Sequence, residues 1–547
     1  MSKPKVATAA LDSAVLDSEH VGDIRGALGT IRLDDTSPRR GMSATIKTLL
    51  AIVGPGLIVM VGDNDAGAFA TYGQAGQNYG TRLMWTLALL IPVLYVNQEM
   101  VLRLGAVTGV GHARLILERF GKFWGAFSVI DLFLLNALTI ITEFIGVTLA
   151  AGYLGLPKVL SVVLAGLVIV GSAFTGSFRR FERMAMAFCG ASLLLIPVYF
   201  MAHPAASQIA RSFVVPQLPG GSGQLSTVML LIIGIVGTTV APWQLFFQQS
   251  YVIDKRITPR FMKYEKADLW IGIVIVVVGA AAVMGITTTA FAHTHAFGDF
   301  TNAGGLASGI GAYAGRAGGV LFAIALLDAS VIGAFAVSLS TAYAIGDVLG
   351  LKHSLHRGVK GAKGFYAIYG GVIAVAAAVV LIPGSPLGLM TEGVQVMAGV
   401  LLPSATVFLL LLCNDRAVLG PWVNGRKTNA FASVVVAVLV TLSIVLTAAE
   451  VLPHITAGQI VTILICCAAG SVLAGAFTLA RRLRPGSVAT LPIDRTGRAS
   501  WRMPPLTLLD RPVLSTGRKL AMSAMWLYLL IAIILVVVRI AEMALAN

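Results

Sequence analysis

Three polar side chains follow one another inside an apolar stretch that is long enough to span a membrane. Asp63, Asn64 and Asp65 stand between two glycines, Gly62 and Gly67, and mainly apolar residues flank them on both sides. A carboxylate at bilayer depth costs roughly 2.5 kcal/mol or more unless it is paired, hydrated or bound to a cation. Oxygen-bearing side chains bracketed by glycines are typical of an unwound, ion-coordinating break in a membrane helix. We therefore predict that this stretch binds a cation.

The composition of the chain is that of a polytopic membrane protein. Of its 547 residues, 57% are hydrophobic and only 12% are charged, and the mean hydropathy is +0.85. A soluble protein of this length needs a charged surface that the sequence does not provide. The net charge of +15 does not indicate nucleic-acid binding, because Lys and Arg concentrate in alternate connections between apolar runs. This positive-inside pattern predicts a cytoplasmic N-terminus.

Apolar runs of about 20 residues predict thirteen membrane-spanning helices in an all-α protein. The runs lie near 46–79, 82–103, 122–152, 157–176, 184–203, 225–251, 267–292, 316–346, 364–383, 388–413, 429–450, 457–480 and 519–545. We expect residues 1–45 to form a cytoplasmic tail with a short amphipathic helix near 21–31. Residues 481–518 are expected to form a cytoplasmic basic linker before the last run, 519–545.

The sixth apolar run contains a second break. Between Gly234 and Gln244 the run carries glycines, threonines and Pro242. The first and sixth runs hold equivalent positions in two sets of five, 46–203 and 225–413. Because five is an odd number, the second set is inverted relative to the first, and helices 11 and 12 follow at 429–480. Interrupted helices at matching positions of inverted repeats mark the substrate site of many transporters.

Several motifs resemble the NRAMP family of divalent metal transporters. They are Gly54-Pro55-Gly56, Asp65 to Ala68, Arg103-Leu104-Gly105, Glu143 to Gly146, Phe178 to Glu182, Ala241 to Gln244 and Asn414-Asp415-Arg416, spread over residues 46 to 450. The resemblance implies a LeuT-type fold with two inverted repeats of five helices and about three extra C-terminal helices. It also implies a multi-pass protein of the bacterial inner (plasma) membrane that works by alternating access.

The departures from the family pattern concern the ion. The family's sixth-span methionine corresponds to Ala241, its histidine to Trp243 and its asparagine to Gln244, while the first-span proline and asparagine correspond to Ala66 and Ala68. This pattern is similar to that of the prokaryotic NRAMP-related magnesium transporters. Thioether sulfur favours softer metals, whereas carboxylate and amide oxygens suit Mg²⁺, which keeps several of its waters.

The residue types and the resemblance together give a candidate site. We expect Asp65 to be the main charge, with Asp63, Asn64 and Gln244 contacting the ion or its waters. The freed carbonyls of Gly62 and Val240, next to Ala241, would complete the shell. Residues expected to shape the site or to act through a ligand are Trp243, Ala68, Gln395, Glu143, Gln248 and Asp328. The ion, Mg²⁺ or Mn²⁺, is the substrate, and we expect no cofactor.

Proton coupling is predicted to be weak or absent. The resemblance places acidic residues in the third span of proton-coupled relatives and a histidine further along the sixth. Glu143 matches one of the acidic residues, but Ile140 and Gln248 stand where the relatives have the aspartate and the histidine.

Two other transport functions stay open at this point, a proton-coupled Mn²⁺ or Fe²⁺ importer and a cation-coupled organic-solute symporter of the same fold. An enzyme is not expected, because the chain has no HExxH motif and no phosphate-binding glycine loop. The expected partners are the metal ion and the lipid bilayer.

Overall fold

The computed structural model describes residues 15–219, 225–383, 387–451, 455–483 and 494–510, with scattered positions between 512 and 538. Within these residues, ten helices are long and apolar enough to cross a membrane. The predicted fourth span is a shorter apolar helix, Lys158–Ala173, and the predicted first span is divided into three helices. Most of the predicted thirteenth span, 519–545, lies outside the described residues.

The helices follow the predicted apolar runs closely. In chain order they are α2 (Met42–Ile52), α3 (Pro55–Val61), α4 (Ala66–Tyr79), α5 (Trp85–Thr108), α6 (His112–Phe120), α7 (Lys122–Tyr153), α8 (Lys158–Ala173), α9 (Phe178–Ala191), α10 (Leu195–Ala202), α11 (Ala206–Val214), α12 (Leu225–Thr239), α13 (Pro242–Asp254), α14 (Met262–Phe291), α15 (Ala303–Leu349), α16 (Lys363–Val380), α17 (Leu387–Cys413), α18 (Arg416–Leu419), α19 (Arg426–Val451) and α20 (Ala457–Leu483). Short 3₁₀ turns such as η1 (Ser18–His20) and η3 (Ser192–Leu194) join some of them.

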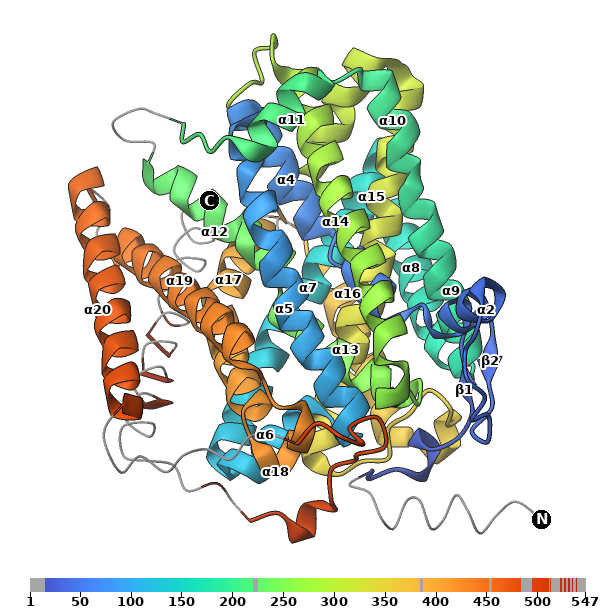
Figure 1. The fold of residues 1–547 in the computed structure, drawn as a ribbon. Coiled ribbons are helices and arrows are strands. Elements are labelled where there is room, and N and C mark those ends of the chain that lie inside the picture. The colour runs from blue at the N-terminus through green and yellow to red at the C-terminus, as the bar shows by residue number, and fades with distance from the viewer. Residues whose placement is uncertain are drawn as a thin grey trace.

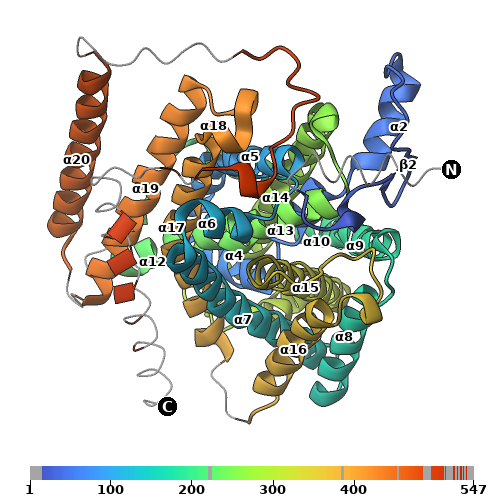
Figure 2. The same ribbon diagram turned by 90° about the horizontal axis from the view of Figure 1, so that it is seen from below.

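The bundle is built around the two broken spans. Helices α3 and α4 pack on α14, α12 packs on α17, and α7 runs along α15. The broken elements are therefore surrounded by long helices that hold them in place. One of these helices, α15, is kinked at Gly315, where the backbone leaves the helical conformation (φ 82°, ψ 164°). Helices α19 and α20 stand at one edge of the bundle (Figures 1 and 2), where α20 packs on α19. Only 6% of the most apolar part of α20 is buried inside the protein. This is expected for a helix that faces lipid on most sides.

The N-terminal segment forms a small hairpin, so the predicted amphipathic helix near residues 21–31 is wrong. Strand β1 (Ile24–Arg25) pairs antiparallel with β2 (Thr30–Ile31). The turn between them is tied to the bundle, because the Ala27 N–H donates to Glu182 Oε2 at 2.5 Å. Asp17, which precedes η1, binds the Arg357 guanidinium through both carboxylate oxygens, at 2.5 and 3.0 Å. These long-range bonds, and not the local hydrophobic pattern, determine the conformation of the segment.

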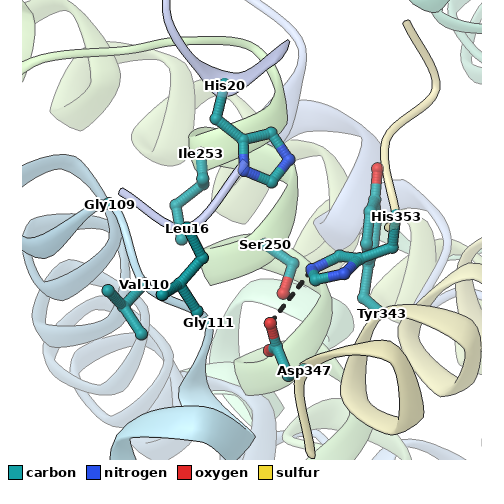
Figure 3. A pocket seen from close by; sticks show the side chains of 10 residues that line it. All are labelled: Leu16, His20, Gly109, Val110, Gly111, Ser250, Ile253, Tyr343, Asp347 and His353. Atoms are coloured by element: carbon teal, nitrogen blue, oxygen red, sulfur yellow. Dashed lines mark ion pairs between the residues drawn. The ribbon is translucent and has the colours of Figure 1, made fainter. Parts of the chain in front are cut away.

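The N-terminal segment also places His20 at a small pocket that Asp347 and His353 line as well. His20 and His353 point into it, and the dashed line in Figure 3 marks the ion pair between His353 and Asp347. His353 Nδ1 bonds the Leu351 carbonyl at 2.7 Å, and its Nε2 lies 3.0 Å from Asp347 Oδ1. Burial disfavours a charged ring, but the hydrogen bond and the charge of Asp347 outweigh it and raise the pKa of His353 to about 9.

Candidate ion-binding site

The first break is held open by a side chain from another helix. Helix α3 ends at Gly62, and α4 begins at Ala66 with Asp65 as its N-cap. In a continuous helix the Ala66 N–H would bond the Gly62 carbonyl. It donates instead to Glu143 Oε2 on α7, at 3.2 Å. The Gly62 carbonyl is thereby released from the helix ladder, as an ion ligand must be.

The second break follows from proline and from a shortened turn. Helix α12 ends at Thr239, and α13 begins at Pro242, which has no N–H to donate. The Gln244 N–H, which would bond the Val240 carbonyl in a continuous helix, bonds the Ala241 carbonyl at 3.2 Å. The Val240 carbonyl is therefore released as well.

Two hydrogen bonds join the breaks to each other. The Gln244 side-chain amide donates to Asp63 Oδ1, while the second oxygen of Asp63 is buried without a hydrogen-bond partner. On the other side of the gap, the Tyr72 hydroxyl lies 2.7 Å from the Thr239 hydroxyl, linking α4 to α12. The polar groups of the two broken spans thus face one another.

Sequence reasoning missed one member of this cluster. Gln98 on α5 is fully buried and donates through Nε2 to Gln244 Oε1 at 2.8 Å. This bond leaves the Gln244 amide nitrogen aimed at Asp63. The signal was present in the sequence, because Asn97, Gln98 and Glu99 form a polar triplet inside an apolar run.

Asp65 lies among polar groups from three helices. Asp65 and Glu143 both lie against Gly333 of α15. Gln395 of α17 lies against Gly67 beside the Asp65 carboxylate, and its Nε2 has no hydrogen-bond partner. The structure therefore brings Glu143 and Gln395 to Asp65.

The cluster is closed to solvent in this structure. The side chains of Asp63 and Gln244 are 0% exposed and that of Asp65 is 3% exposed. Trp243 packs against Gly62 and is itself buried, and Ala68 contributes its N–H, which donates to Asp65 Oδ1 at 2.8 Å. Within the described part of the chain, no three His, Cys, Asp or Glu side chains gather at metal-ligand spacing. The groups gathered between the breaks are thus two carboxylates, released backbone carbonyls and the Gln244 amide, whose nitrogen faces Asp63.

Three predicted site residues are placed differently. Asn64 turns toward α14, where its Nδ2 donates to the Val276 carbonyl at 3.2 Å, so it does not face Gln244. Asp328 accepts from Ser192 at 3.4 Å and is not brought to the breaks. Gln248 lies one turn after Gln244 and is buried with neither amide atom hydrogen-bonded. The structure therefore does not bring Asn64, predicted to contact the ion or its waters, or Asp328, predicted to shape the site or to act through a ligand, into the cluster.

The chain is similar in sequence to known metal-ion transporters. Residues 56–449 match the family model Nramp, described as natural resistance-associated macrophage protein-like. The divalent metal cation transporter MntH of Ralstonia nicotianae is 28% identical over 416 residues, which cover 72% of this chain and 89% of that protein. MntH of Deinococcus radiodurans is 27% identical over 422 residues, covering 73% and 89%.

A solved structure shares the fold. The manganese transporter of Eremococcus coleocola, in complex with an aromatic bis-isothiourea substituted compound, superposes with a TM-score of 0.61 at 22% identity. The match covers 82% of this chain and 97% of that chain. The predicted LeuT-type fold is confirmed, and the match over residues 56–449 assigns the chain to the Nramp family of metal-ion transporters, which are not enzymes.

Proposed function

We propose that this protein carries divalent metal cations across the membrane by alternating access, with the ion bound between the two helix breaks. Asp65 and Asp63 supply the charge, the carbonyls of Gly62 and Val240 supply neutral oxygens, and Gln244 holds the Asp63 carboxylate in place through its amide N–H. The observation that carries the proposal is the diversion of two helix N–H groups, those of Ala66 and Gln244, which releases carbonyls beside two buried carboxylates.

The ion is proposed to be a hard divalent cation, Mn²⁺ or Mg²⁺. The first residue of the second break is Ala241, whose methyl group offers no sulfur ligand. Oxygen donors accept both ions, while softer metals favour thioether and thiolate. The names of the relatives favour Mn²⁺. The lack of a thioether at position 241 supports Mg²⁺ as a second substrate. Family membership disfavours the organic-solute alternative.

The test is ion uptake into proteoliposomes that contain the full-length protein. We expect saturable entry of Mn²⁺ and Mg²⁺ that Asp65→Ala abolishes. Ala241→Met should strengthen competition by Cd²⁺ relative to Mg²⁺ by roughly tenfold, because it adds a soft ligand. Val434→Met, at a residue of α19 that is 60% exposed, is the matched control and should change nothing. Ion uptake that survives Asp65→Ala would contradict the proposed site. Entry of Mn²⁺ in a protein that neither transports Mg²⁺ nor is inhibited by it would contradict only the proposal that Mg²⁺ is a second substrate.

Weak or absent proton coupling is proposed for the same site. Glu143 is engaged by the Ala66 N–H, and Ile140 and Gln248 cannot titrate. The membrane potential supplies about 2.3 kcal/mol per charge per 100 mV, so uptake of a divalent cation does not require a proton gradient. A pH dye inside the vesicles tests this proposal. Acidification that accompanies Mn²⁺ entry and is lost in Glu143→Gln would show that the Asp65–Glu143 pair passes a proton, as in the proton-coupled alternative.

A further inference from the structure

An apolar cavity of about 510 Å³ lies on the side of the bundle formed by α10, α14 and α15. These three helices pack against one another (Figure 1). The residues at the cavity rim, Leu193, Ile196, Phe200, Val274 and Val278, are between 50% and 67% exposed. In a protein that crosses the membrane, such residues face lipid acyl chains. The cavity is therefore continuous with the interior of the bilayer.

One residue of the cavity lining carries an unpaired hydrogen-bond acceptor. Asn64 lines the cavity, is 9% exposed, and packs beside Gly279, where a side chain on α14 would collide with it. Its Nδ2 donates to the Val276 carbonyl, but its Oδ1 is buried without a hydrogen-bond partner. Leaving such an oxygen unpaired is costly, so the site favours an occupant that carries a donor.

The lining restricts the chemistry of that occupant. The residues around the cavity include no Asp, Glu, Lys, Arg or His, so a charged ligand would find no partner at bilayer depth. A plain hydrocarbon would fill the apolar volume but leave Asn64 Oδ1 unpaired. The volume falls in the range of small-molecule sites.

We propose that this cavity binds a neutral, membrane-soluble alcohol that enters from the bilayer. Its hydroxyl donates to Asn64 Oδ1, and its hydrocarbon part lies along α10 and α14. Asn64 stands between Asp63 and Asp65, so an occupant that fixes Asn64 also fixes the first break. Occupancy therefore slows transport, a consequence that rests on the proposed function, whereas the binding itself does not.

Photolabelling with a diazirine-bearing long-chain alcohol tests the binding. The full-length protein is labelled in liposomes, and the labelled residues are mapped by mass spectrometry. We expect labels on residues 192–200 and 274–282. Dodecanol should displace them at roughly fivefold lower concentration than dodecyl methyl ether, which cannot donate a hydrogen bond.

Two variants separate the cavity from the lipid-facing surface in general. Ala282→Phe fills the cavity at a position away from both breaks and should remove the labelling. Val375→Phe, on α16 and 60% exposed, is the matched control and should leave it intact. In Asn64→Leu, dodecanol and dodecyl methyl ether should displace the label at the same concentration. Labelling that persists in Ala282→Phe, or equal displacement by the two competitors in the wild type, would overturn the proposal.

Transport then distinguishes this inference from the proposed function. Dodecanol should slow Mn²⁺ uptake by the wild type and by Val375→Phe, but not by Ala282→Phe. Specific labelling in a protein that moves no metal would leave the alcohol site standing and refute the transport proposal. Labelling without any effect on active transport would overturn the inhibitory part of the inference.

Discussion

Lys255 and Glu182 form an ion pair of 2.7 Å between side chains that are both fully buried. Lys255 Nζ also donates to the Ile52 and Val53 carbonyls, at 2.6 and 2.9 Å, where the chain bends between α2 and α3. The second oxygen of Glu182 accepts the Ala27 N–H of the N-terminal hairpin. One ion pair thus ties the N-terminal segment, α9 and the start of the broken span together.

Removal of one partner of this pair should destabilise the protein strongly. We expect Glu182→Leu to cost about 3–5 kcal/mol, because it leaves the Lys255 charge buried without a partner. The double variant Glu182→Leu/Lys255→Met should recover only part of the loss, because the Ile52 and Val53 carbonyls and the Ala27 N–H also lose their partners. Thermal unfolding of the detergent-solubilised protein measures both effects. The exposed pair Arg32–Asp34 provides a control, and Asp34→Asn should leave the midpoint unchanged.

The bond from Gln98 to Gln244 should matter for ion binding. Gln98→Leu removes the donor that keeps the Gln244 amide N–H on Asp63, so the Asp63 carboxylate loses its positioning, and we expect Mn²⁺ affinity to fall roughly tenfold. Isothermal titration of the purified protein gives this number. Asn97→Leu is the matched control on the same helix, because neither amide atom of Asn97 has a hydrogen-bond partner, and its affinity should match the wild type. Equal effects of the two substitutions would refute the role given to Gln98.

Glu143 should be needed as a hydrogen-bond acceptor more than as an acid. Glu143→Gln keeps an oxygen for the Ala66 N–H, so ion binding should persist. In Glu143→Leu the Ala66 N–H can return to the Gly62 carbonyl, which removes a proposed ligand, and ion binding should be lost. Titration of both variants with Mn²⁺ decides the point, and loss of binding in Glu143→Gln alone would show that the charge is required.

Stability should depend on pH through His353. Its pKa is about 9 in the folded protein against an ordinary value of 6.5, so the folded state binds the proton more tightly. The stabilisation is complete below pH 6.5, declines as the pH rises and is lost above about pH 9, and amounts to about 3 kcal/mol. Unfolding midpoints measured between about pH 6 and about pH 10 should fall for the wild type and stay flatter for His353→Gln.

The sequence alone predicts where the two helix breaks lie, but it does not predict where the side chains within them point. Carboxylates and glycines at 62–67 and Pro242 at the start of α13 are local signals, and the structure has its breaks there. The direction of Asn64 depends on the close approach of Gly279 on α14, which no local pattern specifies. Gln98 reaches Gln244 only because α5 packs on α13. The N-terminal hairpin likewise depends on Glu182 and Arg357, which are distant in sequence.

The bond between Ala66 and Glu143 has a consequence for biogenesis. The residue that holds the first break open is synthesised 77 positions after Ala66, on a later membrane segment. An unpaired N–H is costly in the bilayer. If residues 55–79 were inserted alone, the Ala66 N–H would therefore donate to the Gly62 carbonyl, and the segment would form a more continuous helix. No single inserted segment therefore carries the proposed ion site. The site forms only when α7 packs against the first break, after the helices have been inserted into the membrane.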